Sequence, residues 1–374
     1  MTLSNAFNGI FKDKTVLVTG HTGFIGSWLT EWLCELQANV IGYSLEPPTS
    51  PSLFSALNLE KKISHNIGDI NDSKKLQNTI EKHSPEIIFH LAAQPLVKTS
   101  YSIPKDTFQT NVMGTVNLLE SIRNVSSVKI CTVITSDKCY ENRELSYAYK
   151  ETDPMGGYDP YSASKGATEL VISSYRNSFF NPENYNNHGV SLSSSRTGNV
   201  IGGGDWAENR IVPDCVKALS KNENIEIRNP NSVRPWQYVL EPISGLFCLT
   251  ENMYNDPQKY AQAWNFGPLT KNPPVKVNEL SLKIIDEWGN GNLIDLSENN
   301  ESHEAHLLML DSSKAIKNLD WHPVYSITES VNETVAWYKE FYECNDKMDE
   351  FSKNQILNYS RKAKQMNITW ACSK

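Results

Sequence analysis

The chain of 374 residues lacks the features that would direct a protein to a membrane or to nucleic acid. No apolar run approaches the roughly 18 residues of a spanning helix, and the N-terminal segment has no basic region followed by a long apolar run, which argues against a signal peptide. The net charge is −8 and no basic cluster occurs, which argues against nucleic-acid or anionic-lipid binding. We therefore expect a cytoplasmic protein.

A metal-binding or disulfide framework is also missing. The seven cysteines are scattered without a CxxC pair, as is typical of reduced thiols in the cytosol. His303 and His306 in "HEAH" lack the spacing of a metalloprotease helix. We therefore expect no metal site.

Short apolar runs alternate with helical patterns in the first half of the chain. The runs are continuous and rich in β-branched residues, as in strands that are covered on both faces. They lie at 15–20, 39–44, 63–69, 86–93, 129–136 and 189–200. Repeated strand–helix–strand units indicate a parallel sheet, so the sequence predicts an α/β fold with a Rossmann-type doubly wound sheet.

The alternation ends near residue 200, where Gly, Pro and Asn become frequent. We predict that residues 1–197 form the dinucleotide-binding domain and that residues 198–374 mainly form a smaller, C-terminal substrate-binding lobe. A stretch near 234–268 is expected to pack back on the first domain.

A glycine loop, "VTGHTGFIG", follows the first predicted strand and opens the first helix. Gly20 would allow the tight turn, Gly23 the approach of a pyrophosphate, and Gly26 close packing of helix on strand. The unpaired N–H groups of the helix then face the phosphates. We therefore predict a dinucleotide site here, which also includes Thr22, Phe24 and Ile25.

The acidic residue that commonly binds the adenosine ribose is absent, because the second strand ends at Ser44. A serine hydrogen-bonds a hydroxyl more weakly, so we predict a looser hold on NAD. Asp69 after the third strand is placed to reach the adenine amino group. The other residues expected near the cofactor are Ile70, Leu91, Ala92, Ala93, Gln94 and Thr110, whereas His90 is expected to pack within its strand.

Tyr161 and Lys165 lie one helical turn apart in "YDPYSASKGA", on a helix whose start is marked by Asp159-Pro160. A lysine cation and a positive nicotinamide ring would lower the pKa of the phenol and let it act as a base. Ser136, which ends the preceding strand, could hold the sugar hydroxyl or the phenol. We predict that these three residues are catalytic and that Tyr161 and Lys165 also contact the cofactor.

With "TGHTGFIG", "HLAAQ", Ser136 and "YSASK" the chain resembles the extended short-chain dehydrogenase/reductase family. More closely, it is similar to the sugar-nucleotide dehydratases of the type that acts on CDP-glucose, through stretches such as "TSDKCYENRE", "GGYDPYSASKG", "GNVIGGGDW" and "RPWQYVLEP". It departs from that pattern at Ile25, where lysine is usual, and at 145–149, where a tryptophan-rich segment is usual.

The resemblance implies a lyase that binds NAD and CDP-glucose and assembles as a homodimer or homotetramer. Oxidation at carbon 4 makes the carbon 5 hydrogen acidic, water leaves across carbons 5 and 6, and the hydride returns to carbon 6. Asp137, kept protonated by enclosure, would donate a proton to the leaving hydroxyl. Lys138 would remove the carbon 5 proton or stabilise the enolate, and the division of these roles stays open.

The resemblance also implies substrate contacts in the second half of the chain. An arginine fork suits a pyrophosphate, so Arg234 is expected there with Asn199 beside it, and Arg228 is expected as a more general nucleotide contact. Trp206 either shapes a nucleobase slot or packs in the core. Three alternatives remain: a dehydratase of another sugar nucleotide, a sugar-nucleotide 4-epimerase or dehydrogenase, and an NAD-binding scaffold without activity.

Overall fold

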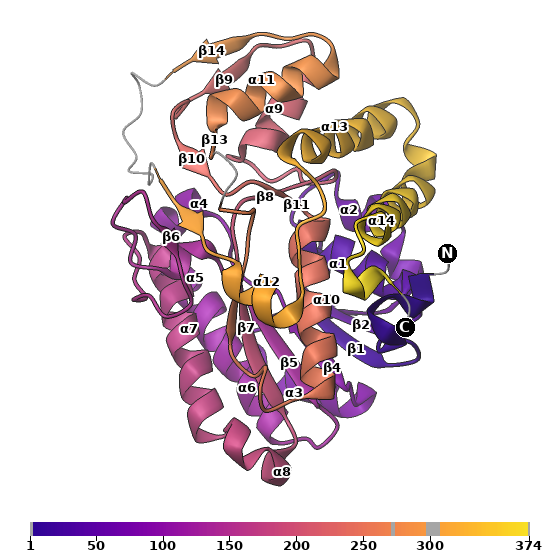
Figure 1. Ribbon diagram of the computed structural model, residues 1–374, viewed down its shortest axis with the longest axis vertical. Helices are drawn as coiled ribbons and strands as arrows, with labels where there is room; N and C mark the ends of the chain where they lie inside the picture. Colours follow the sequence, from indigo (N-terminus) through magenta and orange to yellow (C-terminus); the bar gives the residue numbers. More distant parts are fainter. Residues whose placement is uncertain (1–2, 271–273, 297–306, 373–374) are drawn as a thin grey trace.

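The computed structural model describes residues 3–270, 274–296 and 307–372, so His303 and His306 lie outside the described residues. Its centre is a parallel sheet of seven strands in the order β12-β7-β5-β4-β1-β2-β3 (Figure 1). The strands are β1 (Thr15–Thr19), β2 (Asn39–Ser44), β3 (Ser64–Ile67), β4 (Ile87–His90), β5 (Ile130–Ile134), β7 (Ser191–Thr197) and β12 (Ala263–Phe266).

Six of these strands coincide with the six predicted apolar runs and differ from them only at the ends. The predicted fold class is therefore confirmed. The seventh strand, β12, was not among the predicted strands. It pairs in parallel with β7, with Ala263 opposite Ser194 and Phe266 opposite Thr197, and it is the edge strand on that side of the sheet.

Helices cover both faces of the sheet because alternate residues of each strand point to opposite sides. In β1, Val16 and Val18 join one buried cluster while Leu17 joins the other. The helices up to β7 are α1 (Phe24–Glu35), α2 (Leu53–Ala56), α3 (Ser73–His83), α4 (Val97–Ser102), α5 (Pro104–Phe108), α6 (Gly114–Arg123), α7 (Pro160–Ser178) and α8 (Tyr185–His188). A π-helical turn at Gln109–Met113 joins α5 to α6.

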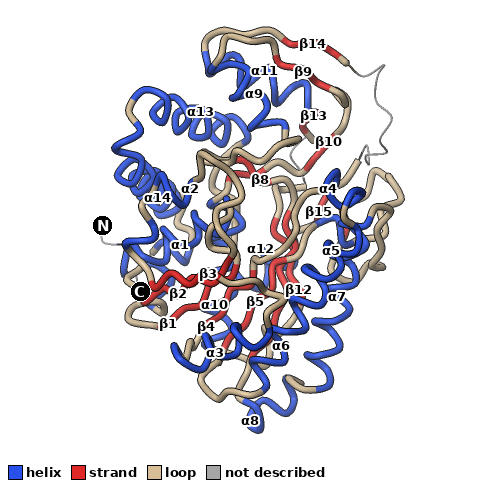
Figure 2. Tube along the Cα trace, turned by 180° about the vertical axis from the view of Figure 1, so that it is seen from behind, coloured by secondary structure: helices blue, strands red, loops and turns tan. Residues whose placement is uncertain are grey.

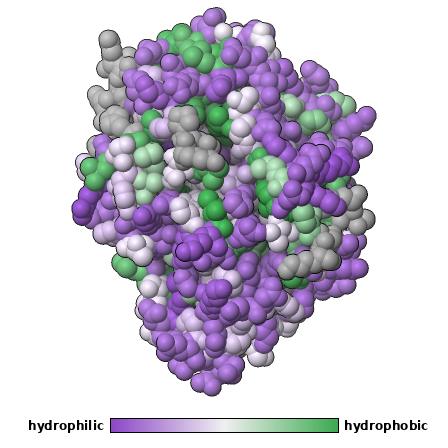
Figure 3. Space-filling view, viewed as in Figure 1, coloured by the Kyte–Doolittle hydropathy of each residue, from purple (hydrophilic) through white to green (hydrophobic). Residues whose placement is uncertain are grey.

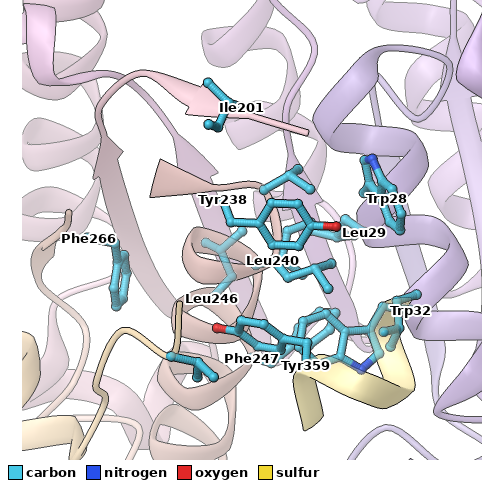
Figure 4. Close-up of a cluster of buried hydrophobic side chains, with 14 of the residues drawn as sticks. Trp28, Leu29, Trp32, Ile201, Tyr238, Leu240, Leu246, Phe247, Phe266 and Tyr359 are labelled. Atoms are coloured by element: carbon cyan, nitrogen blue, oxygen red, sulfur yellow. The ribbon is translucent and has the colours of Figure 1, made fainter. Parts of the chain in front are cut away.

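The larger buried cluster connects the first helix to the second half of the chain (Figure 4). Trp28 and Trp32 of α1 lie in it beside residues of α10 and α14, such as Phe247 and Tyr359. The later helices are α9 (Ile211–Ser220), α10 (Leu240–Asn255), α11 (Val277–Trp288), α12 (Ser313–Leu319), α13 (Ile327–Glu343) and α14 (Met348–Gln365).

A smaller lobe with α9 and α11 lies beyond one end of the sheet (Figures 1 and 2). Two-stranded ladders pair β10 with β13, β8 with β11, β9 with β14, and β6 with β15. Their bounds are β6 (Ala148–Tyr149), β8 (Val200–Ile201), β9 (Ile225–Ile227), β10 (Val233–Arg234), β11 (Gln237–Tyr238), β13 (Val275–Lys276), β14 (Leu293–Asp295) and β15 (Met309–Leu310). The lobe therefore stands over the carboxyl end of the parallel sheet.

The two ends of the described chain pack together, as Figure 1 shows. The rings of Phe7 and Trp370 stack with their centroids 4.8 Å apart. The face seen in Figure 3 is mostly hydrophilic, with hydrophobic residues in small separate groups. None of the helices in the described part of the chain is long and apolar enough to cross a bilayer.

Candidate active site

One cavity of about 1040 Å³ lies between the carboxyl ends of the strands and the lobe. The residues predicted for cofactor, catalysis and substrate all line it, with the exception of Gln94. In open parallel α/β sheets this edge is where ligands bind, because the loops that follow the strands converge there. The fold thus brings together residues that are as far apart in sequence as Gly20 and Arg234.

The glycine loop places backbone rather than side chains against the cavity. Gly20 has φ +76°, and a Cβ on it would lie 2.7 Å from the Ala92 nitrogen. A Cβ on Gly26 would lie 2.1 Å from the Gly20 oxygen, whereas Gly23 has no contact closer than 3.4 Å. Gly23 is also the N-cap residue of α1, and no side chain accepts a hydrogen bond from the first amides of that helix. These amides therefore remain available for a phosphate.

Ser44 is held by a neighbour in the glycine loop. The Thr22 hydroxyl donates to the Leu45 carbonyl over 2.9 Å and lies 2.8 Å from the Ser44 Oγ. Because the single proton of Thr22 goes to Leu45, Ser44 donates to Thr22 and its Oγ keeps acceptor capacity. Asp69 is exposed at the mouth of the cavity, where its Oδ1 accepts from the Asn71 amide.

The turn after β4 differs from the prediction at Gln94. Its backbone nitrogen donates to Asn111, its Nε2 donates to Thr107, and its Oε1 accepts from the Leu96 amide. Gln94 therefore fixes the loop and does not line the cavity, which Ala92 and Ala93 do. Nothing in the motif "HLAAQ" indicates which of its residues turns away from the cavity.

Helix α7 carries Tyr161 and Lys165 to the cavity wall. Asp159 caps the helix by accepting from the Ser162 amide, and Pro160 occupies its first turn, which confirms the predicted start. Against the rise that burial causes, the Ser136 side chain acts on the phenol of Tyr161 and lowers its pKa, and the Lys165 ammonium lies 3.4 Å from the Ile134 carbonyl. The end of β5 and the start of α7 therefore form one constellation.

Ser136 also organises the turn that follows β5. Its hydroxyl donates to Asp137 Oδ1 over 3.0 Å and accepts from the Lys138 amide over 3.2 Å. Burial raises the pKa of Asp137, while the charges of Lys138 and Arg234 oppose that rise. The Asp137 Oδ2 atom is buried and has no hydrogen-bond partner among the described residues. The carboxyl is thus suited to carry a proton and to present it in the cavity.

The electrostatics of the tyrosine and lysine differ from the expectation. Burial raises the pKa of Tyr161 to about 12, and the nearby charge that opposes this most is that of Arg210 rather than that of Lys165. Burial also lowers the pKa of Lys165 to about 8. In this pocket, loss of hydration shifts the pKa values of Tyr161 and Lys165 more than the electrostatic interaction between the two groups does.

The part of the cavity on the side of the lobe is lined by Asn199, Arg228 and Arg234, the residues predicted to bind the substrate. Arg234 is buried, and Arg228 is exposed with its Nη2 3.4 Å from Asn209 Oδ1. Trp206 lines the cavity but is mostly buried against Trp337, Tyr338 and Phe341. Most of the Trp206 side chain is therefore packed in the core, as one of the two predicted alternatives states, and only a small part of it borders the cavity.

A further arginine at the cavity was missed by the sequence analysis. Arg210 Nη1 lies 2.8 Å from Asp205 Oδ2, and the Asp205 side chain is only 7% exposed. Its charge also acts on the pKa of Tyr161. Both residues lie in the segment "DWAENR", which has no helical or strand periodicity. The sequence therefore did not indicate that they would lie near the start of α7, which comes much earlier in the chain.

The chain belongs to the extended short-chain dehydrogenases/reductases, through the family described as GDP-mannose 4,6 dehydratase, whose model matches residues 17–334. It is 50% identical to the CDP-glucose 4,6-dehydratase of Salmonella typhimurium over 350 residues, which cover 93% of this chain and 97% of that protein.

Solved structures show the same fold at lower identity. A dTDP-glucose 4,6-dehydratase from Streptomyces venezuelae with NAD and TYD bound is 21% identical, with a TM-score of 0.74 over 87% of this chain and 97% of that one. A UDP-glucose 4-epimerase from Thermotoga maritima with UDP-glucose is 23% identical, with a TM-score of 0.74 over 88% and 99%. One fold thus carries both dehydratases and epimerases.

Proposed function

We propose that the protein catalyses the 4,6-dehydration of CDP-glucose, with loss of water and formation of the 4-keto-6-deoxy sugar nucleotide. The observation that carries this proposal is the buried Asp137 carboxyl beside Ser136 and Tyr161, with Lys138 next in the chain. An epimerase or a simple dehydrogenase needs the tyrosine and lysine but no additional acid and base. The 50% identity to a CDP-glucose 4,6-dehydratase supports the choice of nucleotide.

We infer that the cofactor is NAD, held at the glycine loop. The clear space beside Gly23 and the uncapped start of α1 suit a pyrophosphate. Ser44, with an acceptor atom left over, suits a ribose hydroxyl, and Asp69 suits the adenine amino group. NAD bound there would supply the hydride-transfer chemistry of the scheme, the oxidation at carbon 4 and the reduction at carbon 6 of the sugar.

The residues of the chain supply the proton transfers of this scheme. Tyr161 takes the proton of the carbon 4 hydroxyl, while Ser136 orients that hydroxyl and Lys165 holds the ribose beside it. Asp137 donates a proton to the leaving carbon 6 hydroxyl, and Lys138 removes the carbon 5 proton or stabilises the enolate. The raised pKa of Asp137 supports its role as the acid, because a carboxyl must stay protonated until it donates.

The substrate nucleotide is assigned to the lobe side of the cavity. Arg234 is proposed to bind the pyrophosphate with Asn199 beside it, and Arg228 to contact the nucleotide at the rim. We propose that Trp206 borders the nucleobase slot with the edge that lines the cavity. This division leaves residues 1–197 mainly with the cofactor and residues 198–374 mainly with the substrate.

A panel of CDP-, dTDP-, GDP- and UDP-glucose, each with added NAD, tests the proposal. The expected result is loss of one water by mass spectrometry and migration of a label from carbon 4 to the new methyl group, with CDP-glucose turned over fastest. Appearance of a 4-epimer, or a label at carbon 4 that exchanges with solvent, would reject the 4,6-dehydration scheme.

We further propose that the protein is a homodimer or homotetramer in the cytoplasm. The neighbouring helices α5 and α7, with the π-helical turn that follows α5, expose Phe108, Met113 and Leu170, the last to 62%, and such a face suits a second copy of the chain. All seven cysteines are free, as in a reducing compartment. Analytical ultracentrifugation of Leu170→Lys should show a smaller species than the unmodified protein; an unchanged mass would reject this interface.

A further inference from the structure

A buried carboxylate, Glu169, connects the catalytic turn to the helix that carries Tyr161 and Lys165. It lies one turn beyond Lys165 on α7 and is 3% exposed. Its Oε1 accepts from the Thr135 hydroxyl over 2.5 Å, and Thr135 directly precedes Ser136. The position of the catalytic turn relative to α7 therefore depends on this bond.

The second oxygen of Glu169 joins the same helix to strand β7. Its Oε2 accepts from the Ser194 hydroxyl and from Arg196 Nη2, each over 2.8 Å. Arg196, which is 4% exposed, continues to the Tyr140 hydroxyl over 2.8 Å. Both oxygens of the carboxylate are thus bonded, and the group cannot move without breaking contacts to the turn after β5 and to strand β7.

The charge of Glu169 is maintained despite burial. Burial alone would raise its pKa, but the Arg196 charge and the three hydrogen bonds hold that pKa below its usual value. Arg196 from β7 and Arg176 from α7 both face Glu169. Glu169 is therefore an anion inside the protein, 4 residues from Lys165 along the helix (169 − 165).

Lys165 has few other partners. The titratable groups of the described residues that interact with it are Glu169 from α7, the Cys139 thiol after β5, and His90 from β4. The pKa of Cys139 is raised well above its usual value and that of His90 is lowered to about 3, so both are neutral at physiological pH. Among these groups, Glu169 is the one that opposes the loss of the lysine charge.

We propose that Glu169 is a positioning residue for the dehydration: it holds Thr135, and thereby the Ser136–Asp137 turn, against α7, and it supplies the counter-charge that keeps the Lys165 ammonium protonated. This inference rests on the proposed function. Glu169 does not reach the cavity, so it acts through its neighbours and does not touch substrate or cofactor.

The test is the pH profile of kcat for CDP-glucose, at saturating NAD, in Glu169→Gln. The amide keeps the shape and an acceptor for Thr135 but removes the charge. We expect the alkaline limb, where Lys165 loses its proton, to move to lower pH by about one unit or more. Thr135→Val should show the complementary result, a kcat lowered by about tenfold with the limb unmoved, and Thr135→Ser should restore kcat.

A matched control separates this effect from the general loss of a buried ion pair. Glu31 is also a buried carboxylate with 0% exposure, paired with Lys62 over 2.7 Å away from the cavity. Glu31→Gln is expected to change stability but neither kcat nor the pH profile. If Glu169→Gln fails to fold because Arg196 is left unpaired, the double variant Glu169→Gln with Arg196→Met removes both charges and should still move the limb.

Superimposable pH profiles for Glu169→Gln and the unmodified protein would overturn the counter-charge role, and unchanged kcat in Thr135→Val would overturn the positioning role. NMR titration of isotope-labelled lysine side chains reports the charge of Lys165 without turnover. A lower titration midpoint in Glu169→Gln supports the inference even if none of the four sugar nucleotides is turned over, a result that would reject the proposed function alone.

Discussion

The two ends of the cavity use different chemistry. At the glycine end, Gly20, Gly23 and Gly26 present backbone atoms, and Ser44 with Thr22 presents hydroxyls. At the proposed catalytic end, Asp137, Tyr161 and Lys165 are ionisable side chains, each at most 8% exposed and each with a shifted pKa. A ligand at the glycine end would therefore meet backbone atoms and hydroxyls at close range, whereas a ligand at the other end would meet ionisable groups.

This difference determines which changes each end tolerates. A backbone surface is disturbed by added atoms, because a new Cβ meets a neighbour that cannot move. A buried charged site is disturbed by substitutions of equal shape that alter a proton or a charge. We therefore expect isosteric changes to affect turnover at the catalytic end, and added atoms to affect cofactor affinity at the glycine end.

The largest effect is expected for Tyr161→Phe, which removes one oxygen and leaves the ring in place. Without the phenol no base takes the carbon 4 proton, so kcat should fall by about a thousandfold or more. Steady-state turnover of CDP-glucose measures this, and NAD titration should show nearly unchanged affinity. Retention of more than a tenth of the activity would contradict the assignment.

Asp137→Asn should lower kcat by about a hundredfold, because the amide cannot donate a proton to the leaving hydroxyl. In the proposed scheme the oxidation at carbon 4 does not use Asp137, so it should persist in this variant. We therefore expect reduced nicotinamide to accumulate on mixing with CDP-glucose, as seen in its absorbance, whereas Tyr161→Phe should accumulate none. Loss of both steps in Asp137→Asn would show that Asp137 serves the oxidation as well.

At the glycine end, Gly26→Ala adds one methyl group that would lie 2.1 Å from the Gly20 oxygen. The forced shift of helix from strand should lower the free energy of unfolding by about 1–3 kcal/mol and weaken NAD binding. Denaturant unfolding and NAD titration measure the two effects. An unchanged kcat at saturating NAD would support the view that the glycine end affects cofactor affinity alone. A lower kcat at saturating NAD would contradict that view.

The smallest effect is expected for Ser44→Asp, which supplies the absent carboxylate. Hydrogen bonds from the ribose to a charged acceptor should tighten NAD by roughly threefold to tenfold, as measured by calorimetry of the protein stripped of cofactor. Ser44→Ala is the matched control and should bind NAD no more tightly than the unmodified protein. Weaker binding by the aspartate variant would mean that the Thr22 contact matters more than the missing charge.

Local patterns were sufficient to predict most of the sheet and the position of the main motifs. The runs of β1, β2, β4 and β5 are rich in β-branched residues, which suits a sheet that helices cover on both faces, whereas β3 and β7, with the sequences "SHNI" and "SLSSSRT", lack that composition. The start of α7 followed from Asp159 and Pro160, whose side-chain acceptor and fixed φ act within one turn.

The remaining features depend on contacts between distant segments. β12 has four residues, "AWNF", and becomes a strand only because β7 offers it an edge. Arg210 reaches the neighbourhood of Tyr161 only after the lobe is folded over the sheet. The pKa of Tyr161 could not be predicted either, because the sequence shows that Lys165 is near but not how deeply both groups are buried.

The late arrival of β12 has a consequence for synthesis on the ribosome. The six earlier strands and the helix that bears Tyr161 emerge first, but β7 keeps an open, hydrogen-bonding edge until residue 266 has left the exit tunnel. The smaller lobe is completed later still, because β10 and β9 pair with β13 and β14, which both follow β12 in the chain. For the same reason a chimera of two relatives joined near residue 198 would take β7 from one parent and its border strand β12 from the other, so the pairing of these two strands would have to form between residues of different origin.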